Sequence, residues 1–446
     1  MTKRSHGDAR ARAMSLLGSR LTSVAATAAV VLAAAPLVGC ETEAACAPAE
    51  LGALKRAPDA AVVTSLFRES SAIALLAGDH ELLTEAWLDS GSAPAGVTSA
   101  LGGDVVLPTV AHPGELVLVE RRGVDLITRI DLGTGKVLGQ HSAQHAQAGS
   151  GAAYRSNAQD ALRLSATEIL VSRHEPNFDD DPDPLDGGNA LVRIDLGRNE
   201  IVERIALDHL NDEVDGMTIY ARPSRMVRIG TKIVIGLARL SEGFDVAGTG
   251  MVAVLDVSTR KATPIALEGL SNCGEVRPVL GDDTRVLVLC AGETFSDADG
   301  RRAEAGLVLL ESDGSALRVA AVWKATDHPT LPPPQFGAVS LGGARFVYES
   351  LSIDADRSDA LVAVDITSGE GETIDVYPLD GGDARLQFNL GPGAFLPDED
   401  VLLVPLATGG VLRWKVTDAL APSPLETLDP SPCRSLPARE IALLRP

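Results

Sequence analysis

Aromatic residues are scarce in this chain of 446 residues, where Phe, Trp and Tyr together make up 3%. Surfaces that bind sugars usually rely on exposed aromatic rings, so the shortage argues against a lectin. The three tryptophans, Trp87, Trp323 and Trp414, each fall in an apolar run, which predicts that they lie in the core. Few rings are then left to form a carbohydrate-binding platform.

Basic residues are also in short supply. The chain has 39 Lys and Arg residues against 61 Asp and Glu, which gives a formal net charge of -22. Such a chain repels nucleic acid and anionic lipid headgroups, and it attracts cations or basic partners. We therefore do not expect nucleic-acid binding.

The signatures of common catalytic sites are missing. The sequence contains no G-x-S-x-G, no H-E-x-x-H and no phosphate-binding G-x-x-x-x-G-K-[ST]. Gly248-Thr249-Gly250 imitates part of a dinucleotide fingerprint, but it precedes a predicted strand instead of joining a strand to a helix. No residue is predicted to be catalytic.

An uncharged run near the N-terminus, residues 21–37, follows a segment with five Lys and Arg residues. This layout is typical of a secretory signal. Leu37-Val38-Gly39-Cys40 closes the run and resembles a bacterial lipobox, in which a signal peptidase cuts before a cysteine that carries lipid. The resemblance implies a lipidated Cys40 and a place in the bacterial cell envelope, on the periplasmic or cell-surface side of a membrane, with the outer membrane favoured. An uncleaved membrane anchor and ordinary secretion are the alternatives.

These features divide the chain into three parts. Residues 1–39 are the predicted signal peptide, residues 40–60 form a flexible lipid-anchored tether rich in Ala, Pro and Glu, and residues 61–446 form the folded domain.

Four further cysteines suggest disulfides in an exported chain. Cys273 and Cys290 flank a predicted hairpin around residues 281–283 and would lie nearly opposite each other. Cys46 and Cys433 would then join the start of the domain to its end. Other pairings and four free thiols are the alternatives.

Seven short apolar runs, most of them led by a polar residue, recur 53 to 64 residues apart. Runs of this length between turn residues are typical of buried strands. They are Val62–Phe67, Glu115–Val119, Glu168–Val171, Lys232–Ile235, Arg285–Leu289, Arg345–Tyr348 and Asp400–Val404.

A second strand that ends in Asp, followed by a turn, comes after most of these runs. The Asp residues are predicted to accept hydrogen bonds from turn N–H groups and so to be structural caps. They are Asp131, Asp195, Asp256 and Asp365.

Seven multi-strand units without a helical period predict an all-β fold, a β-propeller of seven four-stranded blades. The first unit has three apparent strands, and Arg439–Leu444 could supply the fourth and close the ring. Six or eight blades would also be compatible with the pattern.

The segment Val124–Val137 resembles YVTN-type bacterial propeller repeats, which share its strand, Ile-Asp turn and Thr-Gly-Lys-Val sequence. From about Asp59 onward the chain resembles propeller-like bacterial lipoproteins. The resemblance implies a propeller fold. Glu311 and Lys415 depart from the repeat because they stand where it has Asp.

Three acid-rich insertions are predicted between the second and third strands of blades three, five and six, which would place them on one face. Alternating Asp residues suit Ca²⁺. An EF-hand is ruled out by Pro184 and Ala190, where that motif needs Gly and Glu. A solvated acidic loop is the alternative. The candidate calcium ligands are Asp179, Asp181, Asp183, Asp297, Asp299, Asp354 and Asp356.

Two acid–histidine pairs, His174-Glu175 and Asp327-His328, are predicted on the same face as candidate binding residues, with ordinary surface pairs as the alternative. His141 and His145 have a spacing that suits a metal on a helix, but they fall in a predicted loop, where a plain polar role is favoured.

Together these observations predict a lipid-anchored, non-enzymatic propeller whose acidic loop face binds or displays a protein partner of the cell envelope, or a cation. A propeller hydrolase or lactonase with a metal held by carboxylates is the alternative. A structural subunit of an envelope complex is a third option.

Overall fold

A computed structural model describes residues 50–78, 80–121, 123–145, 154–293, 298–351, 358–378, 389–408 and 410–445. The chain divides into two units, Met1–Ala45 and Cys46–Pro446, and the described residues belong to the second. The predicted signal peptide, Cys40 and Cys46 lie outside the described residues. In the described part, no helix has the length and hydrophobicity needed to cross a bilayer.

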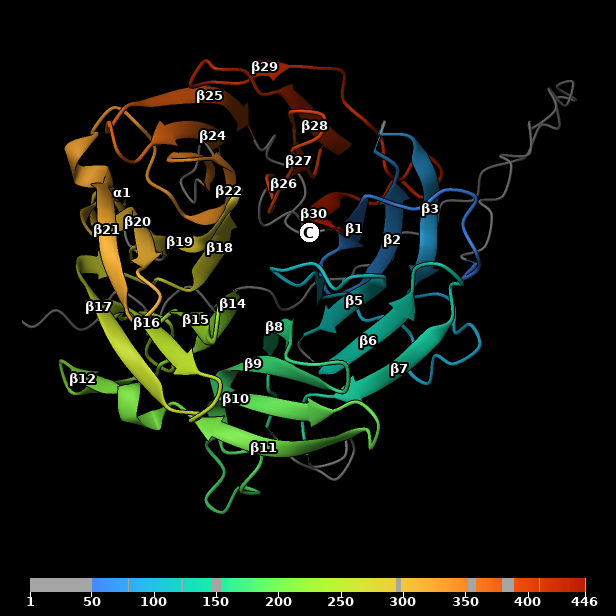
Figure 1. Ribbon diagram of the computed structural model, residues 1–446, viewed down its shortest axis with the longest axis horizontal. Helices are drawn as coiled ribbons and strands as arrows, with labels where there is room; N and C mark the ends of the chain where they lie inside the picture. The colour runs from blue at the N-terminus through green and yellow to red at the C-terminus, as the bar shows by residue number, and fades with distance from the viewer. Residues whose placement is uncertain are drawn as a thin grey trace, which may run out of the picture. The chain divides into compact units, whose positions relative to one another are not determined.

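Seven four-stranded antiparallel sheets form a ring, as Figure 1 shows. The strands of each blade are given from the innermost outward. Blade 1 consists of β30 (Ala438–Leu443), β1 (Ala60–Leu66), β2 (Ser70–Leu76) and β3 (Leu82–Asp89). Blade 2 consists of β4 (Val105–Val106), β5 (Glu115–Glu120), β6 (Leu126–Asp131) and β7 (Val137–Ser142). Blade 3 consists of β8 (Ala158–Arg163), β9 (Glu168–Pro176), β10 (Gly188–Asp195) and β11 (Glu200–Ala206). Blade 4 consists of β14 (Pro223–Ile229), β15 (Lys232–Leu237), β16 (Thr249–Asp256) and β17 (Ala262–Ser271).

Blade 5 consists of β18 (Glu275–Val279), β19 (Asp282–Ala291), β20 (Ala305–Ser312) and β21 (Leu317–Lys324). Blade 6 consists of β22 (Phe336–Gly342), β23 (Arg345–Ser350), β24 (Ser358–Asp365) and β25 (Gly371–Pro378). Blade 7 is β26 (Ala394–Leu396), β27 (Val401–Leu406), β28 (Gly410–Lys415) and β29 (Ser423–Pro424). The seven apolar runs of the sequence all form second strands, so the predicted fold and blade count are confirmed.

Each second strand contains a continuous apolar run because both faces of the strand are covered there by neighbouring blades. Ile233 and Ile235 of β15 pack with Leu170 of β9 in one cluster, whereas Val234 of the same strand packs with Val288 of blade 5 in another. Deleting such a side chain to Ala in a packed core costs about 2–5 kcal/mol. The three tryptophans are buried, as predicted.

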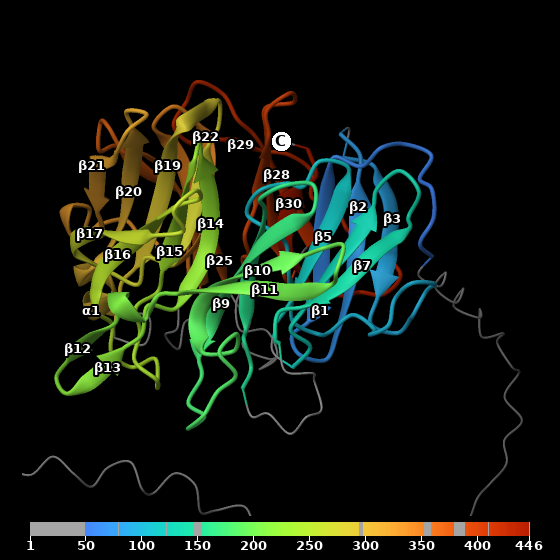
Figure 2. The same cartoon turned by 60° about the horizontal axis from the view of Figure 1, so that its bottom comes forward.

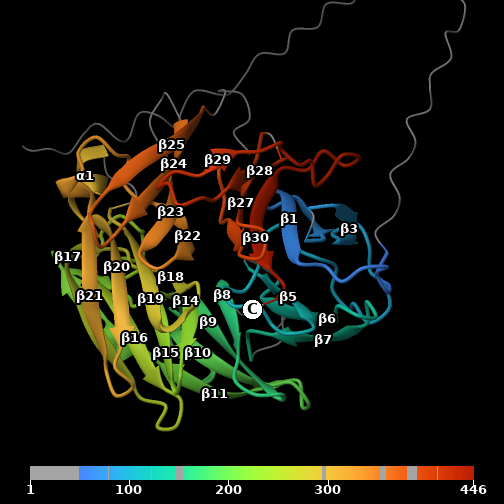
Figure 3. The ribbon, with the colours of Figure 1, turned by 45° about the horizontal axis from the view of Figure 1, so that its top comes forward.

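The ends of the domain meet in blade 1. The C-terminal strand β30 pairs antiparallel with β1, with Val62 opposite Ile441, and Figures 1 and 3 show the two strands side by side. This confirms that a C-terminal strand completes the first blade. Residues just before β1 also pack on this blade, where the Trp87 indole donates to the Gly52 carbonyl at 3.3 Å.

The predicted aspartate caps are confirmed at the turns that follow third strands. Asp131 Oδ1 accepts the Thr134 amide at 2.8 Å, and Asp256 Oδ1 accepts the Thr259 amide at 2.8 Å. Hydrogen bonds from Ser258 and Thr259 lower the pKa of Asp256 to about 2. Each of these carboxylates thus stabilises its own turn.

Cys273 and Cys290 form a disulfide in blade 5, which confirms the predicted pairing. The bond joins the connection before β18 to the end of β19, and both cysteines are fully buried. Cys433 is disulfide-bonded too. Because Cys46 lies outside the described residues, its pairing with Cys433 stays a prediction.

The connections between second and third strands, and those between blades, leave the ring on one side, which we call the insertion face. Figure 2 shows it at the lower edge of the ring, marked by the hairpin of β12 (Asp212–Val214) and β13 (Met217–Ile219) and by the short helix α1 (Ala298–Ala303). The connections that contain the predicted acid-rich insertions, from β9 to β10, from β19 to β20 and from β23 to β24, are all of this kind.

Candidate binding site

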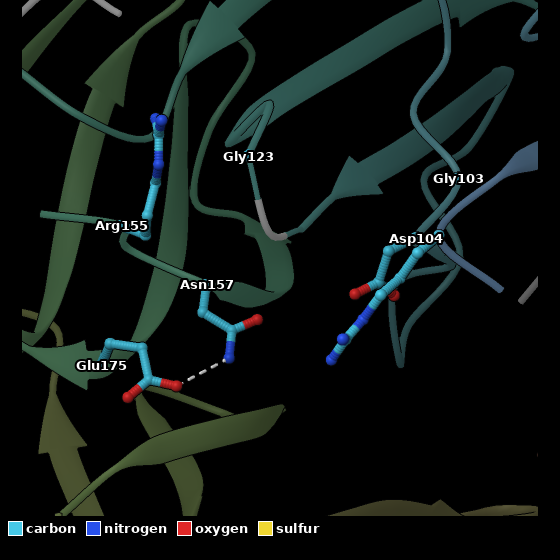
Figure 4. A pocket seen from close by; sticks show the side chains of 7 residues that line it. Gly103, Asp104, Gly123, Arg155, Asn157 and Glu175 are labelled. Carbon is cyan, nitrogen blue, oxygen red and sulfur yellow. Dashed lines mark hydrogen bonds between the residues drawn. The ribbon is translucent and has the colours of Figure 1, made fainter. Parts of the chain in front are cut away.

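A cavity of about 450 Å³ opens on the insertion face over blades 1 to 3. Figure 4 shows Arg155, Asn157 and Glu175 along one side of it and Asp104 along the other. A second cavity of about 290 Å³ extends into the central channel and shares Gly103 and Asp104 with the first. The lining of the first cavity, which we call the arginine pocket, is Arg68, Gly103, Asp104, Gly123, Arg155, Asn157 and Glu175.

Close packing of two connections places Arg68 at this pocket. Arg68 follows β1 with a left-handed φ of 66°, and its amide donates to the Gly103 carbonyl at 2.9 Å. A Cβ on Gly103 would lie 2.5 Å from the Arg68 carbonyl carbon, so only glycine fits there. The Arg68 guanidinium lies over the Phe67 ring at 4.9 Å.

Asp125 fixes the opposite wall. Its Oδ1 accepts the Ser156 hydroxyl at 2.7 Å and the Asn157 amide at 2.8 Å, which ties the connection before β8 to the turn after β5. Burial raises the pKa of Asp125, against the hydrogen bonds from Ser156 and Asn157. Arg155 precedes these two residues and is exposed at the rim.

Each carboxylate of the arginine pocket already has an arginine partner. Asp104 Oδ1 accepts Arg121 Nε at 2.9 Å and Nη2 at 2.6 Å. Glu175 accepts Arg222 Nη1 at 2.6 Å and Asn157 Nδ2 at 3.0 Å. Burial opposes ionisation of Glu175, but His174 and Arg222 hold its pKa below the usual value.

Arg68 and Arg155, by contrast, make no salt bridge with any carboxylate in the described part of the chain. The lining itself holds two arginines and two carboxylates, and the carboxylates are paired with Arg121 and Arg222 from outside the lining. Two guanidiniums of the pocket thus form no salt bridge among the described residues, although the net charge of the protein is -22. The sequence predicted an acidic face and did not predict these two arginines.

A recurring arginine is the sequence signal that could have revealed the pocket. In blades 1 to 4 an arginine stands near the end of the second strand, within the strand at Arg173 and just beyond it at Arg68, Arg121 and Arg239. Two of them are buried and hold loops: Arg173 pairs with Asp186 at 2.7 Å, and Arg239 pairs with Asp212 at 3.2 Å.

A chain of alternating charges crosses the inner strands below the pocket. Arg225 of β14 pairs with Glu440 of β30 at 2.9 Å and with Glu275 of β18 at 3.7 Å, and Glu275 pairs with Arg277 at 2.5 Å. Arg225 also donates to the Leu107 carbonyl at 2.7 Å. This network fastens the C-terminal closing strand to blades 4 and 5.

Glu349 of β23 lies near this network and is buried. Burial raises its pKa to about 8, against the charge of Arg277. Its Oε2 atom has no hydrogen-bond partner among the described residues. A carboxyl group in this setting is largely protonated at neutral pH.

A second feature of the insertion face joins blades 3 and 4. Phe178 packs edge-on against Tyr220 at 5.6 Å, the Arg222 guanidinium lies 5.9 Å from the Tyr220 ring and 4.0 Å from the Phe244 ring, and Phe244 stacks with His174 at 6.1 Å. We call these five residues the aromatic cluster. Phe178 is 54% exposed. Exposed acids on the same loops surround it: Asp179, Asp180, Asp181, Glu242 and Asp245.

The structure thus places one of the two predicted acid–histidine pairs at the site. His174 and Glu175 end β9 and belong to the aromatic cluster and the arginine pocket. Asp327 and His328 lie between β21 and β22, where the His328 ring stacks on Trp323 at 4.5 Å. They line neither cavity.

The predicted calcium ligands that the structure describes do not come together at one point. Asp179 and Asp181 are exposed, whereas Asp183 accepts the Leu185 amide at 2.8 Å and contacts His145 Nδ1 at 3.0 Å. In the described ranges, no three His, Cys, Asp or Glu residues gather as a metal site.

The remaining candidates cannot be placed in the same way. Asp297, Asp354 and Asp356 lie outside the described residues, and so does the side chain of Asp299 in α1. Calcium at these loops therefore stays a prediction. His141 contacts Asn199 at 2.6 Å, so it and His145 have different partners.

No family model matches the chain, and no curated protein matches it. Among solved structures, a Bacteroides fragilis protein provisionally assigned as a 6-phosphogluconolactonase superposes with a TM-score of 0.52 and 10% identity, over 86% of this chain and 97% of its own. A hypothetical selenium-binding protein from Sulfolobus tokodaii gives 0.51 and 12%, over 87% and 94%. At these identities the likenesses support the fold alone.

Proposed function

We propose that this protein is a non-enzymatic binding module of the bacterial cell envelope whose insertion face binds a basic segment of a protein partner. The aromatic cluster is the observation that carries the proposal. The chain has only 8 Phe, 4 Tyr and 3 Trp residues, yet Phe178, Tyr220 and Phe244 gather at one place on this face. Acidic side chains surround them.

This composition suits Lys and Arg side chains. A cation over an aromatic ring gains about 0.5–1 kcal/mol at an exposed site, and about 2 kcal/mol when it is desolvated. The surrounding carboxylates add attraction, and the net charge of -22 steers basic partners toward the protein. Aromatic anchors near the centre of an interface supply a large share of its binding energy.

The carboxylates at the channel mouth favour binding over a metal-dependent hydrolase or lactonase. Asp104, Glu175 and Glu440 are the acids that line the two cavities, and each is paired with an arginine. Their negative charge is already balanced by guanidinium groups, so a metal ion would have to compete with Arg121, Arg222 and Arg225 for them.

We further propose that lipid on Cys40 holds the propeller at the envelope, with residues 1–39 as the signal peptide and residues 40–60 as the tether. The resemblance of Leu37-Val38-Gly39-Cys40 to a lipobox supports this. The Ile-Asp turn at Val124–Val137 supports a relationship to YVTN-type propeller repeats. An anchored ring of this kind would present its loops to a partner in the periplasm or at the cell surface, with the outer membrane favoured.

A defined peptide tests the proposed function. The full chain is titrated with a fluorescent Lys- and Arg-rich peptide and with a Glu-rich peptide of equal length. We expect only the basic peptide to bind, and the binding to weaken with salt. Phe178→Ala should reduce the affinity about tenfold, as the loss of an anchor worth about 1.4 kcal/mol.

The matched control is Val376→Ala, which removes an exposed apolar side chain from the outer strand of blade 6. It should leave the affinity unchanged. Equal binding of both peptides, or equal losses in the two variants, would contradict the proposal.

A further inference from the structure

We propose that the arginine pocket is a binding site for a small organic anion that also carries hydroxyl groups. The carboxylate or phosphate of such a ligand would pair with Arg68 and Arg155, and its hydroxyl groups would donate to Asp104 and Glu175. This site differs from the surface that binds the basic segment, so either proposal can fail without the other.

Charge is the first argument. Arg68 and Arg155 line one cavity and form no salt bridge within the described ranges, while both pocket carboxylates are already paired with arginines. The two guanidiniums are therefore both available to pair with one anion in the cavity. Hydrogen bonds between guanidinium and carboxylate or phosphate are among the strongest in proteins.

The polarity and size of the cavity define the ligand class. About 450 Å³ is within the range of small-molecule sites, which span roughly 300–1,000 Å³. Every lining residue is either charged, an amide or glycine. Hydroxyl groups of a ligand would find carboxylate oxygens as acceptors.

The walls are held in place before any ligand arrives. Arg222, which is 1% exposed, fixes Glu175, and Glu175 in turn fixes Asn157 through its amide. Arg121, which follows β5, fixes Asp104, which precedes β4 of the same blade. Arg68 and Arg155 are the exposed and adjustable members of the set. A site built in this way loses little entropy on binding, because most of its groups are already ordered.

Calorimetric titration of the full chain with four probes tests this site. Glucose 6-phosphate and gluconate carry hydroxyl groups with a phosphate or a carboxylate, glucose carries hydroxyl groups alone, and inorganic phosphate carries charge alone. We expect at least one of the two organic anions to bind, more tightly than glucose and inorganic phosphate. Their relative affinities show whether phosphate or carboxylate is preferred.

Substitutions locate the binding. Arg68→Gln and Arg155→Gln should each weaken the binding of the preferred anion by about 10- to 100-fold, the effect of losing one charge-assisted hydrogen bond. Arg68→Lys should keep part of the affinity. The control Arg318→Gln removes an exposed arginine from the outer strand β21 and should have no effect.

Two kinds of result would overturn the inference. One is the absence of binding by both organic anions at 10 mM, about the weak limit for a specific small-molecule site. The other is binding that Arg68→Gln and Arg155→Gln leave unchanged while both variants keep the wild-type melting temperature. Intact binding of the basic peptide by the same variants would show that only the anion site has failed.

Discussion

The buried carboxyl group of Glu349 should make the propeller lose stability as the pH rises. Glu349 is 1% exposed, and burial raises its pKa from 4.5 to about 8. The folded protein therefore binds a proton that the unfolded chain releases above about pH 4.5. The stabilisation by this group is complete below that pH and is lost progressively up to about pH 8.

The size of the effect follows from the two pKa values. The difference between 4.5 and about 8 corresponds to about 5 kcal/mol in total, most of which lies between pH 5 and pH 8.5. Other ionisable groups also contribute to the pH dependence, so the wild type alone cannot isolate this term. Glu349→Gln can, because glutamine resembles the protonated carboxyl group in shape and carries no charge to bury.

Guanidinium chloride unfolding of both proteins at pH 5, 6, 7 and 8.5 measures the difference. We expect similar stability at pH 5 and a variant that is several kcal/mol more stable than the wild type at pH 8.5. Glu213→Gln, at an exposed position in β12, is the control and should show no such trend. A constant difference between Glu349→Gln and the wild type across this range would refute the reasoning.

Three further predictions concern the ring and its anchor. Arg225→Met should lower the free energy of unfolding by about 3–5 kcal/mol, because Glu440 is left buried without its partner. If denaturant unfolding shows a decrease below about 1 kcal/mol, the charged network does not hold the closing strand in place. The double substitution of Cys273 and Cys290 by Ser should cost about 3 kcal/mol, as expected for a sequence separation of 17 residues, and a thermal melt equal to that of the wild type would contradict this. Cys40→Ser should move the protein from the membrane fraction to the soluble fraction of bacterial cells, and an unchanged distribution would argue against the lipid anchor.

The strands that could be predicted from the sequence are those whose burial requires a run of apolar residues. Second strands such as β15 are covered on both faces, so their apolar runs stand out. Short or exposed strands left no such pattern. β4 has two residues and β29 has two, both exposed in β29. Their places in the ring come from pairing with longer neighbours.

The recurring arginine marks Arg68, but the rest of the arginine pocket could not be recognised from local sequence. Arg68, Asp104, Arg155 and Glu175 belong to three blades and are brought together only when the ring forms. The same limit applied to the alternating aspartates. Asp183 looked like a metal ligand, but the Leu185 amide and His145 are its partners in the fold. Cap residues such as Asp131 were recognised because their partners lie within the same turn.

The central claim, that the insertion face contacts a partner in the cell envelope, is tested most directly by site-specific photo-crosslinking in living cells. A photoreactive amino acid replaces Phe178 in one strain and Val376 in another, both exposed positions. Our account predicts a discrete crosslinked product from position 178, lost when Asp179, Asp180 and Asp181 are changed to Asn, and none from position 376. A product from position 376 alone, or none from position 178, would contradict it.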